Sequence, residues 1–190
     1  MVTFNVPEDV SVDDFFKIHV PDQFNKITEG VDLSSMTGLE FTLQFDIEGK
    51  KYCLKITNGT ELEIIEGGVQ SPVFALSLSE SDWRDAVTGR VQGTFERFID
   101  PMQIADKTRY NKLLATKGTM HVVLEGDNSA TTKASLIFNA EAQPEVTITL
   151  ALSDWVAMQN KEVAGTQLFM SGKLKPQGDM MFLMSLEQLL

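Results

Sequence analysis

The sequence predicts an α+β fold with an internal duplication, in which antiparallel strands form one or more sheets covered on one face by helices. Three observations predict it. Apolar and polar residues alternate over short segments separated by turn residues, as in strands with one buried face. Helix start and stop signals follow these segments. Finally, segment 74–94 is similar to segment 146–166 without a gap.

Composition limits the size of the fold and the classes of partner. The 190 residues fit one medium domain or two small ones, and the apolar fraction of 43% is enough for a substantial core. The net charge of −11, from 16 basic and 27 acidic residues, argues against nucleic acid as a partner and against broad adhesion to anionic membranes. Cys53 is the only cysteine, which excludes an intrachain disulfide.

The sequence predicts a cytoplasmic protein. The opening residues, MVTFNVPEDV, contain neither the basic nor the apolar region of a secretory signal. The longest apolar run, 180–184, is far shorter than the ~20 residues that span a bilayer. We therefore expect no transmembrane segment and at most transient contact with a membrane.

A helix and a group of strands open the chain. Ser11 and Asp14 form a capping-box-like pair at the start of a helix over 11–28, which we expect Pro21 to break or kink. Four alternating segments follow between Gly38 and the first Ser-Asp-Trp. The alternation predicts an antiparallel meander with one face buried and the other in water.

Further helices and a second group of strands complete the chain. The predicted helices cover 79–89, 93–98, 101–118 and 153–170. The predicted strands cover 119–125, 133–139 and 145–153. Gly118 is the expected stop of the third helix. The residues GKLK at 172–175 suit a short edge strand with outward lysines, and Asp179 is a natural N-cap for a helix over 180–190.

The two similar segments indicate two diverged units. Ser-Asp-Trp at 81–83 aligns with Ser-Asp-Trp at 153–155, and the apolar phase of the preceding strand is preserved. The strand within 60–68 has no counterpart in the second half. We expect one unit at 1–117, which includes the N-terminal helix, and a second at 118–190, with the two packed as one globule because each core is small.

A distinctive series of segments ends the chain. VTITLALSDWVAMQ at 146–159 and LFMSGKLKPQGDMMFLMSLEQLL at 168–190 give a strand, an acidic-aromatic helix start, Gly-Lys-Leu-Lys, Gly-Asp and a final apolar helix. This order closely resembles the C-terminal half of the sterol carrier protein-2 family, and the strands of 38–94 resemble it more weakly. The first half has no Gly-Lys-Leu-Lys, so if only one unit holds a ligand, we expect it to be the second.

The resemblance implies a sterol-carrier-like fold that binds a sterol, fatty acid or fatty acyl-CoA in an apolar cavity between sheet and helices. Methionine, abundant near the C-terminus, adapts to varied apolar shapes. The expected lipid-lining residues are Trp155, Met158, Leu168, Phe169, Met170, Met181, Phe182, Met184 and Leu186. Lys173 and Lys175 are the expected contacts for a lipid headgroup. The other interpretation of these side chains is that the apolar ones fill an ordinary core and the lysines are solvated.

The sequence contains no recognisable catalytic constellation. His19 and His121 have neither a nucleophile elbow nor a cysteine partner, and no cluster has metal-ligand spacing. We therefore expect no enzyme activity, no cofactor and no metal. The alternative to lipid carriage is an interaction module that uses the same apolar surface, either to form a homodimer or to serve as an accessory subunit of a lipid-metabolising enzyme.

Overall fold

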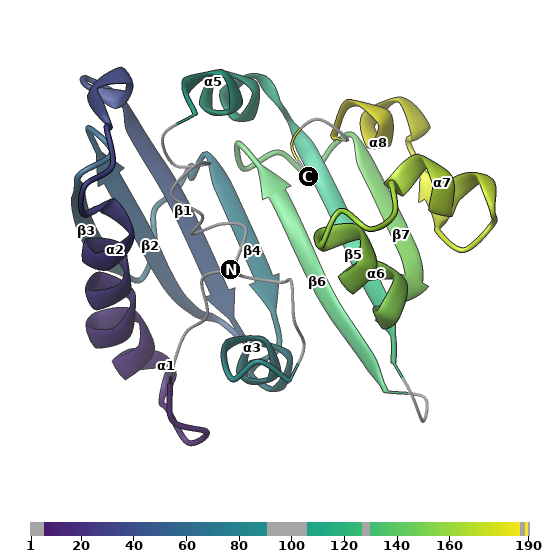
Figure 1. Cartoon of the computed structure of the whole chain (residues 1–190), viewed down its shortest axis with the longest axis horizontal. Coiled ribbons are helices and arrows are strands. Elements are labelled where there is room, and N and C mark those ends of the chain that lie inside the picture. The colour runs from purple at the N-terminus through teal and green to yellow at the C-terminus, as the bar shows by residue number, and fades with distance from the viewer. Residues whose placement is uncertain (1–5, 91–105, 127–129, 187–188, 190) are drawn as a thin grey trace.

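The computed structural model of the chain describes residues 6–90, 106–126, 130–186 and 189. They form one open sheet of eight strands in the order β3-β2-β1-β4-β6-β5-β7-β8 (Figure 1). The strands are β1 Glu40–Ile47, β2 Lys50–Thr57, β3 Glu61–Glu66, β4 Phe74–Leu78, β5 Gly118–Glu125, β6 Thr131–Phe138, β7 Glu145–Ala151 and β8 Lys175–Gly178.

The sheet is mixed. Five neighbouring strand pairs are antiparallel, whereas β4 runs parallel to β1, and β7 runs parallel to β5. The expected antiparallel meander is therefore correct for β1, β2 and β3 and wrong for β4. After β3 the chain crosses to the far edge of β1, and the alternation within a strand does not reveal which neighbour that strand takes.

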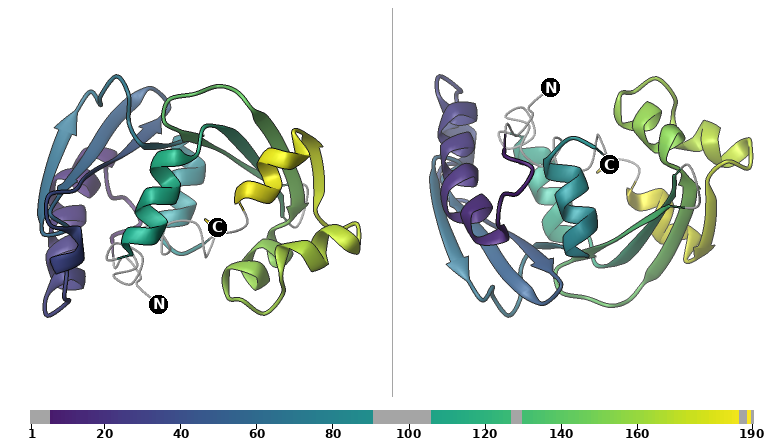
Figure 2. Two further views of the ribbon diagram at one scale, coloured as in Figure 1. Left: turned by 90° about the horizontal axis from the view of Figure 1, so that it is seen from above. Right: turned by 90° about the horizontal axis from the view of Figure 1, so that it is seen from below.

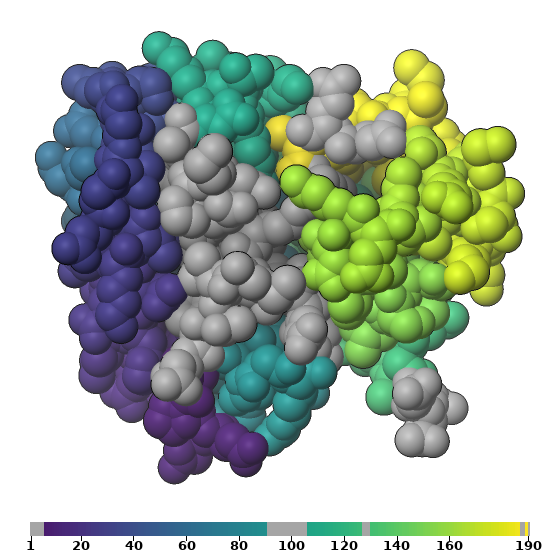
Figure 3. Space-filling model, viewed as in Figure 1, coloured from purple at the N-terminus to yellow at the C-terminus, as the bar shows by residue number. Residues whose placement is uncertain are grey.

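Helices cover the concave face of the curved sheet, as expected (Figure 2). Figure 3 views the molecule from this helical side. The helices are α1 Val12–Asp14, the π-helical turn η1 Phe15–His19, α2 Val20–Thr28, the 3-10 turn η2 Ser34–Met36, α3 Glu80–Val87, α5 Lys107–Ala115, α6 Leu152–Gln159, α7 Gly165–Met170 and α8 Met180–Leu186.

The inward strand residues and the helices share one large core. Leu43, Phe45 and Ile47 of β1 are buried, as their alternation predicts. They belong to a continuous cluster of buried side chains that reaches from Val10 to Leu189. The core is therefore common to both halves of the chain.

The first helix continues past its proline. Ser11 caps α1 as expected, because its Oγ accepts a hydrogen bond from the Asp14 backbone N–H at 3.0 Å. Pro21 lies in the first turn of α2, directly after η1, and does not end the helical segment. Because η1 runs directly into α2, Pro21 lies inside a continuous helical segment, where it removes one backbone hydrogen bond without ending the helix.

Other element boundaries also differ from expectation. The helix predicted over 153–170 is two helices, because the chain turns at Lys161, which has a φ of 61°. Gly118 begins β5 and does not cap α5. The edge strand β8 starts after Leu174, whose side chain is buried in the core. The helix predicted over 93–98 lies outside the described residues.

Both halves of the sheet share one arrangement of strands. In the first half β1 pairs with β2 and with β4, and α3 follows β4; in the second half β5 pairs with β6 and with β7, and α6 follows β7. Trp83 and Trp155 are each the fourth residue of the following helix. In the first half β3 lies next to β2. In the second half the corresponding neighbour of β6 is β4, which comes from the first half. The division into units at 1–117 and 118–190 agrees with this arrangement and stays a prediction.

Candidate functional site

The final helix presents two faces with opposite environments. Asp179 caps α8 as expected, since its Oδ1 accepts from the Phe182 backbone N–H at 2.9 Å. Phe182 and Leu186 are buried, and the Phe182 ring lies edge-on to another buried ring with centroids 6.2 Å apart. Met181 and Met184 are exposed. The helix is therefore anchored by one apolar face and displays a second one.

The other predicted lining residues divide in the same way. Trp155 of α6 and Leu168 of α7 are buried in the core, and Met158 is half-buried against it. Phe169 and Met170, at the end of α7, are exposed. The structure thus gathers part of the predicted set inside the molecule and leaves the rest on its surface.

The two predicted headgroup lysines have different surroundings. Lys173 Nζ lies 2.8 Å from Asp154 Oδ1, so this lysine already pairs with a carboxylate of α6. Lys175 is exposed on the edge strand β8.

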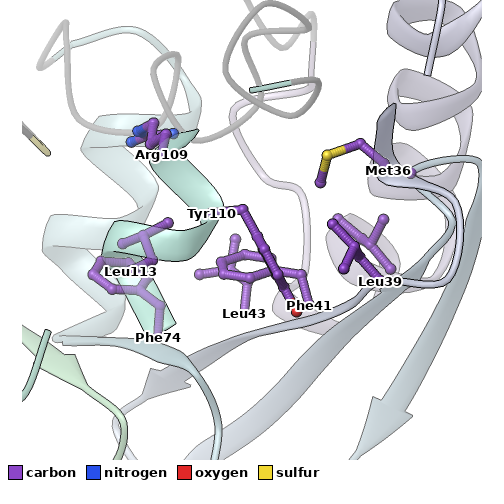
Figure 4. A pocket seen from close by; sticks show the side chains of 10 residues that line it. Met36, Leu39, Phe41, Leu43, Phe74, Arg109, Tyr110 and Leu113 are labelled. Carbon is purple, nitrogen blue, oxygen red and sulfur yellow. The ribbon is translucent and has the colours of Figure 1, made fainter. Parts of the chain in front are cut away.

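An apolar cavity lies between the sheet and α5, and none of its lining residues belongs to the predicted set (Figure 4). Tyr110 and Leu113 of α5 face the strands, and Met36 and Leu39 form the opposite wall. The remaining lining residues are Phe41, Leu43, Ile56, Gly59, Phe74 and Arg109. Its volume is about 60 Å³, which is smaller than the ~150 Å³ that admits a benzene molecule.

The helix over the cavity is fixed at both ends. At its start, Asp106 Oδ1 accepts from the backbone N–H of Thr108 at 2.8 Å. At its end, Asn139 Nδ2 donates to the carbonyl of Leu113 at 2.9 Å and to that of Thr116 at 2.6 Å. Asn139 follows β6, so the sheet itself holds α5 in place.

Among the described residues that line the cavity, Tyr110 and Arg109 have polar side chains. The Tyr110 hydroxyl donates to the carbonyl of Glu40 at 2.6 Å, and burial raises the pKa of its phenol, so it stays protonated at neutral pH. Arg109 Nη2 donates to the carbonyl of Leu189 at 3.3 Å, which ties the cavity wall to the end of the chain. A ligand in this cavity would contact mainly carbon.

The cavity residues were not predicted as a site. Phe41, Leu43 and Phe74 belong to strands whose inward phase is evident from sequence, but every inward strand residue gives the same signal. Asn58-Gly59 is a typical turn pair. Its glycine lets η2 approach closely, since a Cβ on Gly59 would lie 3.1 Å from the Met36 Cβ. Nothing in the sequence indicates that α5 leaves space beneath it.

His121 lies between two polar side chains outside the core. On the face of the sheet away from the helices, His121 Nδ1 lies 2.8 Å from Ser135 Oγ, and its Nε2 lies 3.0 Å from Glu145 Oε1. Among the described residues, no group of three or more His, Cys, Asp or Glu side chains is placed to hold a metal ion. Across the same ranges, no helix has the length and apolar character needed to cross a bilayer.

Solved structures of sterol carrier proteins are similar to parts of this chain. The solution structure of sterol carrier protein domain 2 of Helicoverpa armigera matches at 22% identity and a TM-score of 0.39, covering 54% of this chain and 84% of that one. Sterol carrier protein 2 from Yarrowia lipolytica matches at 17% identity and a TM-score of 0.36, covering 47% and 84%.

A larger enzyme also matches over a small part of its length. The sec-alkylsulfatase Pisa1 from Pseudomonas sp. matches at 13% identity and a TM-score of 0.22, covering 90% of this chain and 16% of that one. No curated protein matches the chain.

The sequence model of the SCP-2 sterol transfer family matches residues 101–190. This range includes α5 with its cavity residues and the whole C-terminal series of elements. Residues 101–190 of this chain are therefore similar in sequence to the SCP-2 sterol transfer family.

Proposed function

We propose that this protein binds and carries a lipid, without catalysis, in apolar space between the concave face of the sheet and the helices. The proposed ligand is a sterol, a fatty acid or a fatty acyl-CoA. The observation that carries the proposal is the apolar cavity beneath α5, in a chain whose residues 101–190 match the model of a sterol transfer family.

A lipid requires more space than the cavity has, so its walls must part. Met36 on one wall is flexible. Leu113 lines the cavity and also belongs to the core cluster that contains Trp155, Leu168, Phe182 and Leu186. As α5 moves, a ligand could extend toward these residues, which remain its proposed lining. Each methylene buried on binding is worth about 0.8 kcal/mol.

Two neighbouring leucines of α5 provide a matched test of the cavity. Leu113 is 9% exposed and lines the cavity, whereas Leu114 is 42% exposed and does not. Leu113→Phe fills the space and should lower the affinity for a fluorescent fatty acid by at least about fivefold, while Leu114→Phe should leave it unchanged. Competition with unlabelled cholesterol and palmitate reports the ligand class. No binding to the unmodified protein, or equal effects of the two substitutions, would contradict the proposal.

The exposed side chains favour a second candidate, an interaction or dimerisation module. Phe169, Met170, Met181 and Met184 present apolar surface on α7 and α8. Exposed apolar groups of this kind mark contact surfaces when they form a patch. Light scattering distinguishes the two candidates. The interaction module is supported if the protein dimerises, binds no lipid, and becomes monomeric when Met181→Ser and Met184→Ser are combined. Lipid binding by a monomer supports the carrier.

A further inference from the structure

The two tryptophans of the chain share an unusual property. Trp83 and Trp155 are buried at equivalent positions, each as the fourth residue of the helix that follows a parallel strand. Neither indole Nε1 has a hydrogen-bond acceptor within the described part of the protein. Buried donors are almost always paired because an unpaired donor loses its bond to water on folding. Two unpaired donors at equivalent positions therefore require an explanation.

The surroundings of the two rings differ. Trp83 is 0% exposed, and Phe15 packs edge-to-face against it with ring centroids 5.4 Å apart at 81°. Phe15 comes from the helical segment that precedes β1. The described helix that precedes β5 is α5, and it turns Tyr110 and Leu113 toward the cavity of the first half (Figure 4).

Trp155 has no comparable aromatic neighbour. It is 6% exposed, and no ring contact is present for it among the described residues. Trp155 belongs to the same core cluster as Leu168 and Phe182, and Met158 is partly buried against that cluster. Among the described residues, the tryptophan of the first half therefore has an aromatic neighbour, Phe15, and that of the second half has none.

The burial of Trp155 indicates what kind of acceptor its N–H can take. The preceding residue, Asp154, is a carboxylate, and Lys173 is paired with it at 2.8 Å. Trp155 is 6% exposed, so an anion that reached its N–H would lose its hydration, and Lys173 is already engaged with a carboxylate. A neutral oxygen avoids that cost and accepts the same hydrogen bond.

We propose that the indole N–H of Trp155 anchors the ligand by donating a hydrogen bond to an uncharged oxygen, a carbonyl or hydroxyl, of an otherwise apolar molecule. The hydrocarbon packs on the Trp155 ring as Phe15 packs on Trp83. This inference rests on the proposed lipid binding and adds an anchoring residue in the second half. It favours neutral alcohols, ketones and esters over carboxylates of equal chain length.

The test uses the indole N–H signals of the full-length, ¹⁵N-labelled protein. The spectrum contains one such signal for each of the two tryptophans, and Trp83→Phe assigns them. The probes are dodecan-2-one, dodecane and dodecanoate. Dodecan-2-one should move the Trp155 proton downfield and slow its exchange with water, dodecane should bind without that shift, and the Trp83 signal should stay in place.

Affinity provides a second measurement. Trp155→Phe should weaken dodecan-2-one binding by about threefold to tenfold more than it weakens dodecane binding, because dodecane loses only ring contact. Trp83→Phe is the matched control and should change neither. If Trp155→Phe does not fold, the indole N–H signals of the unmodified protein still test whether Trp155 donates to the ketone.

The possible failures are separable. If no probe binds anywhere, the proposed lipid function itself is wrong. If the probes bind but dodecan-2-one does not shift the Trp155 N–H signal, or that N–H exchanges as if it contacted only water, lipid binding stands and the Trp155 anchor is refuted. If dodecanoate shifts the Trp155 signal as strongly as the ketone, the preference for a neutral oxygen is refuted.

Discussion

The C-terminal helix provides a direct test of how it packs, because adjacent residues have opposite environments. Phe182 is 5% exposed and Met181 is 79% exposed. Phe182→Ala removes a buried ring that contacts the core, whereas Met181→Ala trims a side chain that lies in water. The same helix and the same cap serve both positions, so differences in helix propensity are small.

The expected cost of Phe182→Ala follows from its burial. A buried aromatic side chain removes about 150–250 Å² from water, which is worth about 4–6 kcal/mol at about 25 cal/mol per Å². Alanine retains part of this burial and the unfolded chain is partly collapsed, so we expect a loss of about 3–5 kcal/mol. Met181→Ala should change stability by no more than about 0.5 kcal/mol.

Urea unfolding followed by far-UV circular dichroism measures both changes. With a slope of about 2 kcal/mol per M, the midpoint should fall by roughly 2 M for Phe182→Ala and stay nearly constant for Met181→Ala. Equal shifts, or a larger shift for Met181→Ala, would show that α8 packs on the core through a different face.

Two further predictions concern the glycine that begins β5 and the hydrogen bond between Tyr52 and Asp13. Gly118 has a φ of 119°, and a Cβ there would collide with the carbonyl oxygen of Pro144, so Gly118→Ala should cost more than about 2 kcal/mol; Gly172→Ala, with positive φ but open space, should cost about 1 kcal/mol by urea unfolding. Equal costs would contradict the close approach. The Tyr52 hydroxyl donates to Asp13 at 2.6 Å and holds the pKa of that carboxyl below its ordinary value. Because folding lowers this pKa, the stabilisation is present above the unfolded pKa of about 3.9 and is lost as pH falls through the folded one. Tyr52→Phe should therefore lower the free energy of unfolding at pH 7 more than at pH 2.5, and a constant difference would exclude this linkage.

Much of the local structure follows from the sequence. The alternation of Leu43, Phe45 and Ile47 predicts both the strand and its buried face, and the cap residues Ser11 and Asp179 act as expected. These features depend on contacts between near neighbours in the chain, so a short window of sequence contains the information.

The remaining features depend on distant partners. The parallel pairing of β4 with β1 is decided by which strand edge is free, and no residue of β4 encodes it. The helix at 180–186 is apolar nearly all round, so its sequence does not indicate that Phe182 faces inward and Met181 outward. The cavity beneath α5 is a space that several elements enclose together, and it exists only once they are assembled.

The position of β4 has a consequence for how the protein loses its structure. This strand bonds to β1 on one edge and to β6 on the other, so it is at once the last strand of the first half and the neighbour that covers the second. A fragment that begins at residue 118 would expose the whole hydrogen-bonding edge of β6, and such edges recruit other chains. The halves should therefore melt in a single cooperative transition, and a fragment that begins at Gly118 should aggregate.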